Sequence, residues 1–106
     1  MAWVLLFLAG LLEIAWAFTM KLSDGFSRPV PSTATIIGML ASFALLSISM
    51  KSLPLGTAYT VWTGIGAIGA FVIGVLALGE PLTVARGIAA VLIVSGLILM
   101  KLATPA

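Results

Sequence analysis

The chain of 106 residues contains no cysteine and no histidine, and only 8% of its residues are charged. Without cysteine there can be no disulfides and no thiolate metal ligands. Without histidine there is neither an imidazole ligand nor a side chain that normally titrates near neutral pH. We therefore expect no metal site and no cofactor, and any proton chemistry must use a carboxylate. The net charge of +2 is too small and too dispersed to indicate a nucleic-acid partner.

Apolar residues are abundant instead, at 62% of the chain. They form four stretches of the length, about 20 residues, that a helix needs to cross a bilayer. We predict an all-α integral membrane protein in which residues 1–106 form a single domain with four spans, at residues 2–21, 31–50, 56–78 and 84–102. Ala15-Trp16-Ala17 fits the cleavage pattern of a secretory signal. However, the first stretch has no Lys or Arg before it and contains an acid, which favours a retained helix.

The basic residues are nearly balanced across the membrane. Four spans place Lys51 and Lys101 on the side of the N-terminus, and Lys21, Arg28 and Arg86 on the other. Two against three is a weak bias under the positive-inside rule, so the chain can insert in both orientations. Many transporters build their site from inverted repeats, and we find no internal duplication here. Two copies inserted in opposite senses would supply the repeat, and we therefore expect an antiparallel homodimer with dual topology.

Glu13 is the only acidic residue among the first twenty, and it lies near the middle of the first predicted span. An ionised carboxylate near the bilayer centre costs roughly 2 to 4 kcal/mol, so it is kept mainly where it binds something. Gly10 and Ala17 share its helical face and leave room for a ligand. We predict a binding site at Glu13, with Gly10 and Ala17 lining its pocket. The alternative is a structural glutamate that is hydrogen-bonded across helices.

The second and third spans offer polar and aromatic side chains to such a site. Ser42 lies near the middle of the second span with Met39 beside it, and we expect Met39 to line the pocket. The Ser42 hydroxyl can donate to a carboxylate, or it can bond its own helix backbone. Tyr59 and Trp62 lie one turn apart in the third span, and with Trp16 they can converge on one pocket and attract a cation. The alternative is an interfacial aromatic belt, which suits Tyr59 better than Trp62.

Gly64, Gly66 and Gly69 reproduce the spacing of the dinucleotide fingerprint GxGxxG. That motif needs a preceding strand, whereas these glycines lie inside one continuous apolar helix, so we reject it. Three glycines within six residues weaken a helix and allow it to bend, and we predict a hinge there. We also expect two residues of this helix to line the pocket: Gly66, which shares the face of Trp62, and Thr63, which follows Trp62 in the sequence.

The fourth span carries a stripe of small and apolar residues on one helical face: Ala89, Leu92, Ile93 and Gly96. Small residues let helices approach closely in lipid. We predict that this stripe forms the dimer interface, with packing inside the same chain as the alternative.

Taken together, these residues resemble the small multidrug resistance transporters over essentially the whole chain. The resemblance is carried by Glu13, Gly56-Thr57-Ala58-Tyr59, Trp62 to Ala67, Glu80-Pro81 and the stripe ending at Gly96. The guanidinium-exporter subtype is indicated by Trp16, Gly25-Phe26-Ser27, Pro31-Ser32, Ser42, Lys51-Ser52-Leu53-Pro54 and Lys101. Thr60 and Ala89 depart from the residues expected there, which are Ala and Gly.

The resemblance implies an antiparallel dimer in the bacterial cytoplasmic (inner) membrane that exports guanidinium-type cations in exchange for protons by alternating access. Proton and cation would compete for Glu13. Trp16 and Ser42 would donate hydrogen bonds to the carboxylates, while Tyr59 and Trp62 would shape the pocket. Guanidinium suits this chemistry because its planar fork of N–H donors matches a carboxylate. Alternatives are a broader quaternary ammonium exporter, a passive cation channel and a non-transporting membrane subunit. We do not expect an enzyme.

Overall fold

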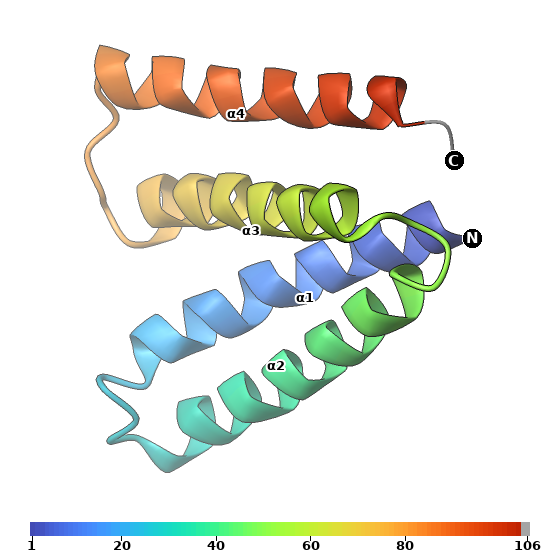
Figure 1. Ribbon diagram of the computed structural model, residues 1–106. Helices are drawn as coiled ribbons and strands as arrows, with labels where there is room; N and C mark the ends of the chain where they lie inside the picture. The colour runs from blue at the N-terminus through green and yellow to red at the C-terminus, as the bar shows by residue number, and fades with distance from the viewer. Residues whose placement is uncertain (105–106) are drawn as a thin grey trace.

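The computed structural model describes residues 1–104, which form four α-helices and no strand (Figure 1). They are α1 (Ala2–Leu22), α2 (Pro29–Ser49), α3 (Leu55–Ala77) and α4 (Val84–Ala103). Each is long and apolar enough to cross a membrane, so the predicted all-helical architecture with four such helices is confirmed. The largest difference from the predicted bounds is that α2 begins at Pro29 rather than at residue 31. Proline is accepted there because the first turn of a helix does not use its N–H group.

The loops and helix ends gather at two opposite ends of the molecule. The α1–α2 and α3–α4 loops lie at one end, whereas the start of α1, the end of α4 and the α2–α3 loop lie at the other (Figure 1). The α1–α2 loop reverses the chain through left-handed backbone angles at Asp24, Gly25 and Phe26. Gly79, with φ +70°, ends α3 in the same conformation, which glycine adopts without steric cost.

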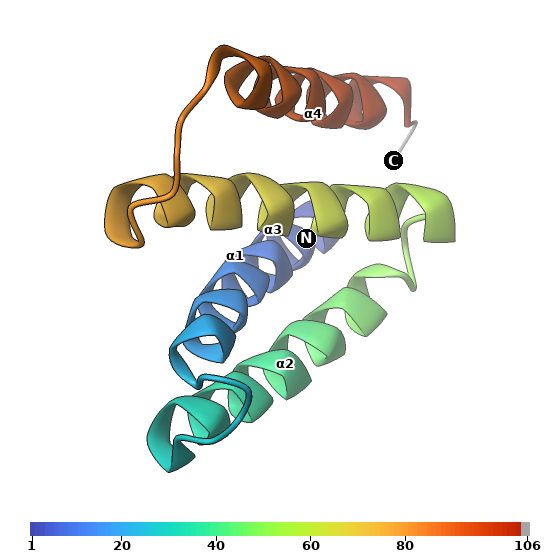
Figure 2. The same ribbon diagram turned by 90° about the vertical axis from the view of Figure 1, so that its left-hand side faces the viewer.

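The helices lie side by side in the order α2, α1, α3, α4, with α1 in extensive contact with both α2 and α3. Helix α4 packs mainly on α3, and α2 meets α3 at few points. The molecule is consequently flat, with extents of 43 × 35 × 16 Å. Figure 2 shows α3 between α4 on one side and α1 and α2 on the other. A single copy is therefore an open slab in which no ring of helices encloses a pathway.

Glycines set how closely these helices approach. A methyl group placed at Gly10 of α1 would overlap Ile65 of α3, and one at Gly69 of α3 would overlap Ile14 of α1. A methyl group at Gly64 would overlap Leu97 of α4 in the same way. Helix α3 runs without interruption through Gly64, Gly66 and Gly69, and each of the three lies against a side chain of a neighbouring helix in this conformation. The hinge at Gly64, Gly66 and Gly69 stays a prediction.

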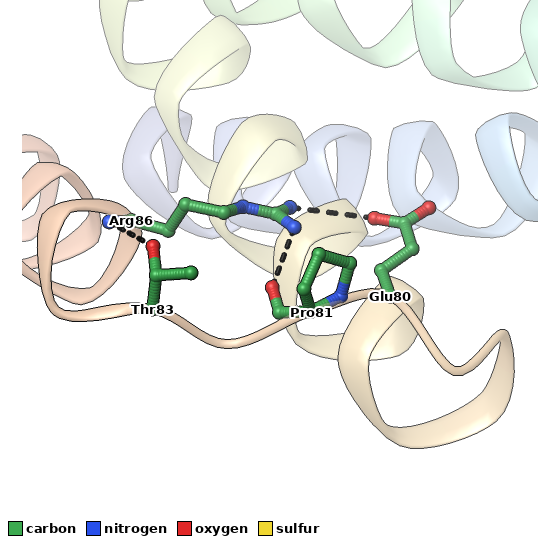
Figure 3. Close-up of polar contacts among 4 residues, drawn as sticks. All are labelled: Glu80, Pro81, Thr83 and Arg86. Atoms are coloured by element: carbon green, nitrogen blue, oxygen red, sulfur yellow. Dashed lines mark hydrogen bonds and ion pairs between the residues drawn. The ribbon is translucent and has the colours of Figure 1, made fainter.

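The polar contacts that join helix α4 to the rest of the chain lie near its two ends. Near its start, Arg86 bonds the Pro81 carbonyl at 2.6 Å and pairs with Glu80 at 3.4 Å (Figure 3). Near its end, the Lys101 ammonium lies 4.8 Å from the centre of the Trp3 ring, and Thr104 bonds Thr57 at 3.2 Å.

Between these ends, α4 is open to its surroundings. None of its residues, all within the described range, is buried by this chain. The predicted interface residues Ala89, Leu92, Ile93 and Gly96 are all exposed, and a methyl group at Gly96 would meet nothing. Ile93 and Gly96 line a groove beside α3, so the stripe borders α3 without being covered by it, and its role as the dimer interface stays a prediction.

The close approach of α1 and α3 can be tested with a matched pair of substitutions. Gly69→Ala would place a methyl group on Ile14, and we expect it to lower the free energy of unfolding by about 1–3 kcal/mol through overpacking. Gly87→Ala in α4 meets no atom and should be neutral or stabilising by up to about 1 kcal/mol. Denaturant titration in mild detergent measures both values. Equal effects of the two substitutions would contradict the role of Gly69.

Candidate functional site

Glu13 lies near the middle of α1 and its carboxylate rests against α3. A methyl group at Gly66 would overlap the Glu13 carboxylate, so the side chain occupies the space that Gly66 leaves open. Within residues 1–104, the buried oxygen Oε1 of Glu13 has no hydrogen-bond partner. A buried acceptor without a partner is unusual in a folded protein and costs about 1–3 kcal/mol, more if the group is charged. This observation argues against a structural glutamate bonded across helices and indicates that its partner comes from outside this chain.

Trp16 lies about one turn from Glu13 on the same helix, and its polar group is also unused. The indole Nε1 is buried, and no residue in the described part of the chain accepts its hydrogen. Its Cβ packs against Gly38 of α2, where a methyl group would come within 2.9 Å. The expected hydrogen bond from Trp16 to Glu13 is therefore not made in a single copy. An unused donor and an unused acceptor lie on neighbouring turns of α1.

Ser42 bonds a different group from the one expected. Its hydroxyl donates to the Ala9 carbonyl at 2.7 Å and accepts from the Trp62 Nε1 hydrogen at 3.0 Å, and both bonds are buried. The expected bond from Ser42 to Glu13 is not made in this conformation, because its single proton goes to Ala9. The alternative, a bond to its own helix, is also not made. Ser42 instead ties α2 and α3 to the backbone of α1, one turn before Glu13.

The aromatic side chains form a row across α1, α2 and α3. Tyr59 and Trp62 have ring centres 5.6 Å apart, and Trp62 meets Phe43 edge-on at 5.8 Å. Phe43 in turn meets Trp16 edge-on at 6.3 Å. The three predicted aromatics therefore do come together, but Trp16 joins the others through Phe43. Sequence reasoning missed Phe43, which differs from its many apolar neighbours only in being aromatic and following Ser42.

The remaining predicted pocket residues lie in different places. Gly10 and Gly66 are buried in the contact between α1 and α3, so neither is free to line an open cavity in a single copy. Met39 is half-buried in α2. Thr63, with Tyr59, lines a groove of about 510 Å³ between α3 and α4, and Glu13 is not among its lining residues.

Ala17 lines a separate cavity of about 130 Å³ between α1 and α3. The predicted site residues are thus distributed over the α1–α3 contact and the surfaces beside it.

The family model described as Small Multidrug Resistance protein matches residues 1–94. The chain belongs to the small multidrug resistance family. It is also similar to curated members named Guanidinium exporter. The protein from Yersinia pseudotuberculosis is 53% identical over 98% of this chain and 100% of its own length. The protein from Citrobacter freundii is 52% identical over 98% of this chain and 99% of its own length. The protein from Salmonella typhimurium strain LT2 is 54% identical over 96% of this chain and 97% of its own length.

These matches confirm the resemblance to the small multidrug resistance transporters and to their guanidinium-exporter subtype. The matched relatives are named as exporters, in agreement with the prediction that the chain is not an enzyme. Membership of this family and the four apolar helices together make the chain a multi-pass membrane transporter.

The bond between Ser42 and Trp62 can be tested by a double-mutant cycle. Ser42→Ala leaves the buried Trp62 N–H without an acceptor, and we expect a loss of about 1–3 kcal/mol in unfolding free energy. Trp62→Phe should cost less in the Ser42→Ala background than alone, because the unpaired donor is then absent, with a coupling of about 1 kcal/mol. Unfolding titrations of the four proteins provide the cycle. Strict additivity would contradict this bond.

Proposed function

We propose that this small multidrug resistance protein is a proton-coupled antiporter that exports guanidinium and small substituted guanidinium cations. The observation that carries the proposal is the Glu13 carboxylate, placed near the middle of a membrane-spanning helix with a buried oxygen that no other group in residues 1–104 satisfies. Guanidinium presents planar N–H donors that fit such an acceptor in pairs. The names of the relatives support this choice of cation.

Exchange follows from competition for one group. A protonated Glu13 is neutral and no longer attracts a cation, whereas a bound guanidinium occupies the oxygens that the proton would need. Loading and release on opposite sides of the membrane then couple the two flows. Phe43, Trp62 and Tyr59 form a row with Trp16, which lies one turn from Glu13, and aromatic faces attract planar cations.

We further propose that the working form is an antiparallel homodimer with dual topology in the bacterial cytoplasmic (inner) membrane. One copy is a slab 16 Å thick in which Glu13 and Trp16 of α1 have polar atoms without partners. A second copy would cover this part of α1 and bring a second Glu13 and Trp16 to it. The exposed stripe of α4, at Ala89, Leu92, Ile93 and Gly96, supports an interface there. Dual topology is supported by the basic residues, of which two lie on one side of the membrane and three on the other, so that the insertion direction is only weakly biased.

Proton release on addition of guanidinium tests the exchange at Glu13. In weakly buffered detergent solution, the native protein should release protons when guanidinium is added, because the cation displaces them from the carboxylate. Glu13→Gln should release none. Asp24→Asn, which removes a carboxylate in the exposed α1–α2 loop, is the matched control and should behave like the native protein.

Absence of release from the native protein would overturn exchange at this residue. Proton release on addition of small quaternary ammonium ions, at concentrations similar to those of guanidinium, would favour the broader quaternary ammonium exporter. A passive channel would conduct guanidinium in vesicles without moving protons against their gradient.

The dual topology can be tested by forcing each orientation. One variant moves basic residues to the side of the membrane that holds the N-terminus, by Arg28→Ala, Ser52→Lys and Ala103→Lys. The second variant moves them to the opposite side, by Lys51→Ala and Ser27→Lys. Each variant alone should lose most of the exchange activity, because all copies then insert in the same sense. Co-expression of the two should restore it. Full activity of either variant by itself would contradict the antiparallel dimer.

A further inference from the structure

A small cavity lies between the last turns of α1 and α3, at the end of the molecule that carries the α1–α2 and α3–α4 loops. Its volume is about 130 Å³, well above the roughly 30 Å³ that one water molecule occupies in the liquid. Two charged residues, Lys21 and Glu80, and two small ones, Ala17 and Ala70, are among the residues that line it. The cavity is thus roomy and polar enough to hold water.

This cavity lies on the same helix contact as Glu13. Ala17 follows Glu13 by one turn on the same face of α1. Ala70 follows by one turn the residue Gly66, against which the Glu13 carboxylate rests. One turn corresponds to about 5.4 Å along a helix. Small side chains on both helices therefore lead from the cavity toward the carboxylate.

The acid at the mouth of the cavity is held in place. Glu80 bends back over the last turn of α3, where a methyl group at Gly74 would overlap its carboxylate. Oε1 of Glu80 pairs with Arg86 at 3.4 Å, and Arg86 is itself fixed by its bond to the Pro81 carbonyl (Figure 3). The Arg86 guanidinium also lies 5.1 Å from the centre of the Phe71 ring.

The charge balance at this mouth depends on Glu80. Within residues 1–104, Lys21 forms no ion pair, and its positive charge lies in the last turn of α1. Glu80 offsets part of the combined charge of Lys21 and Arg86. Without it, Lys21 would be the one charged residue among those that line the cavity.

We propose that this cavity is the outer end of the route by which protons and the cation reach Glu13. In this proposal Glu80 is a positioning residue: its negative charge offsets the positive charge at the entrance of the cavity, so that cations can enter. The inference rests on the proposed function. In an antiparallel dimer the mouths of the two copies face opposite sides of the membrane. Each copy therefore provides the access to one compartment.

Thiol labelling tests the route, because the chain has no cysteine of its own. Ala17→Cys places a thiol on the cavity, and Ala15→Cys is a matched control on the exposed face of the same helix. Both are labelled in vesicles with membrane-impermeant methanethiosulfonates, one carrying a trimethylammonium group and one a sulfonate. We expect Ala17→Cys to react several-fold faster than Ala15→Cys, since a thiol ionises only where water reaches it. Ala70→Cys repeats the measurement from α3.

Substitution of Glu80 tests the mouth. In the Ala17→Cys protein, Glu80→Gln should lower the rate with the cationic reagent relative to the anionic one several-fold, whereas Asp24→Asn should leave the ratio unchanged. An unchanged ratio in Glu80→Gln would overturn the role of Glu80. Lack of reaction at both Ala17→Cys and Ala70→Cys would overturn the route.

Failure of this inference can be told apart from failure of the proposed function, because labelling does not require exchange. Unreactive cysteines in a protein that still releases protons with guanidinium would reject the route alone. Reactive cysteines in a protein that releases none would reject the exchange alone.

Discussion

The contact between α1 and α3 is the constraint on which the site depends. Helices in lipid gain little from burying apolar side chains, so they associate through close packing of small residues. Gly10, Gly66 and Gly69 allow this approach, and Gly66 leaves the space that the Glu13 carboxylate fills. A larger residue at Gly66 would displace the acid. The same glycines that hold the helices together therefore determine where the acid lies.

A second constraint is the cost of leaving polar groups unpaired where water is scarce. The buried hydroxyls in residues 1–104 are satisfied: Ser42, for example, by Ala9 and Trp62, and Thr35 by Thr19 and the Pro31 carbonyl.

The buried side-chain atoms left without partners in residues 1–104 are Glu13 Oε1, Trp16 Nε1 and Trp3 Nε1. Trp3 lies near the start of α1, where headgroups and water are within reach. Glu13 and Trp16 lie deeper, and their unused groups are the basis of the site proposed above.

The architecture was largely predictable and the details of the site were not. Apolar runs between charged residues marked all four helices, since length and hydrophobicity suffice to define a span. Glu13 stood out because an acid is rare at that depth. Helical periodicity placed Ser42 on an inward face, but it cannot tell which atom of a neighbouring helix the hydroxyl meets. Phe43 was missed for a related reason: an aromatic residue in an apolar helix carries no signal until its neighbours are known.

The sequence by itself determined the membrane class, the number of spans and the acid that is out of place in lipid, because these follow from the local balance between hydrophobicity and charge. Only the tertiary structure decided that Ser42 bonds Ala9, that Phe43 joins Trp16 to Trp62, and that α4 keeps an exposed face. Those outcomes depend on the distances and angles between helices, which are set by packing over the whole chain and by no single segment.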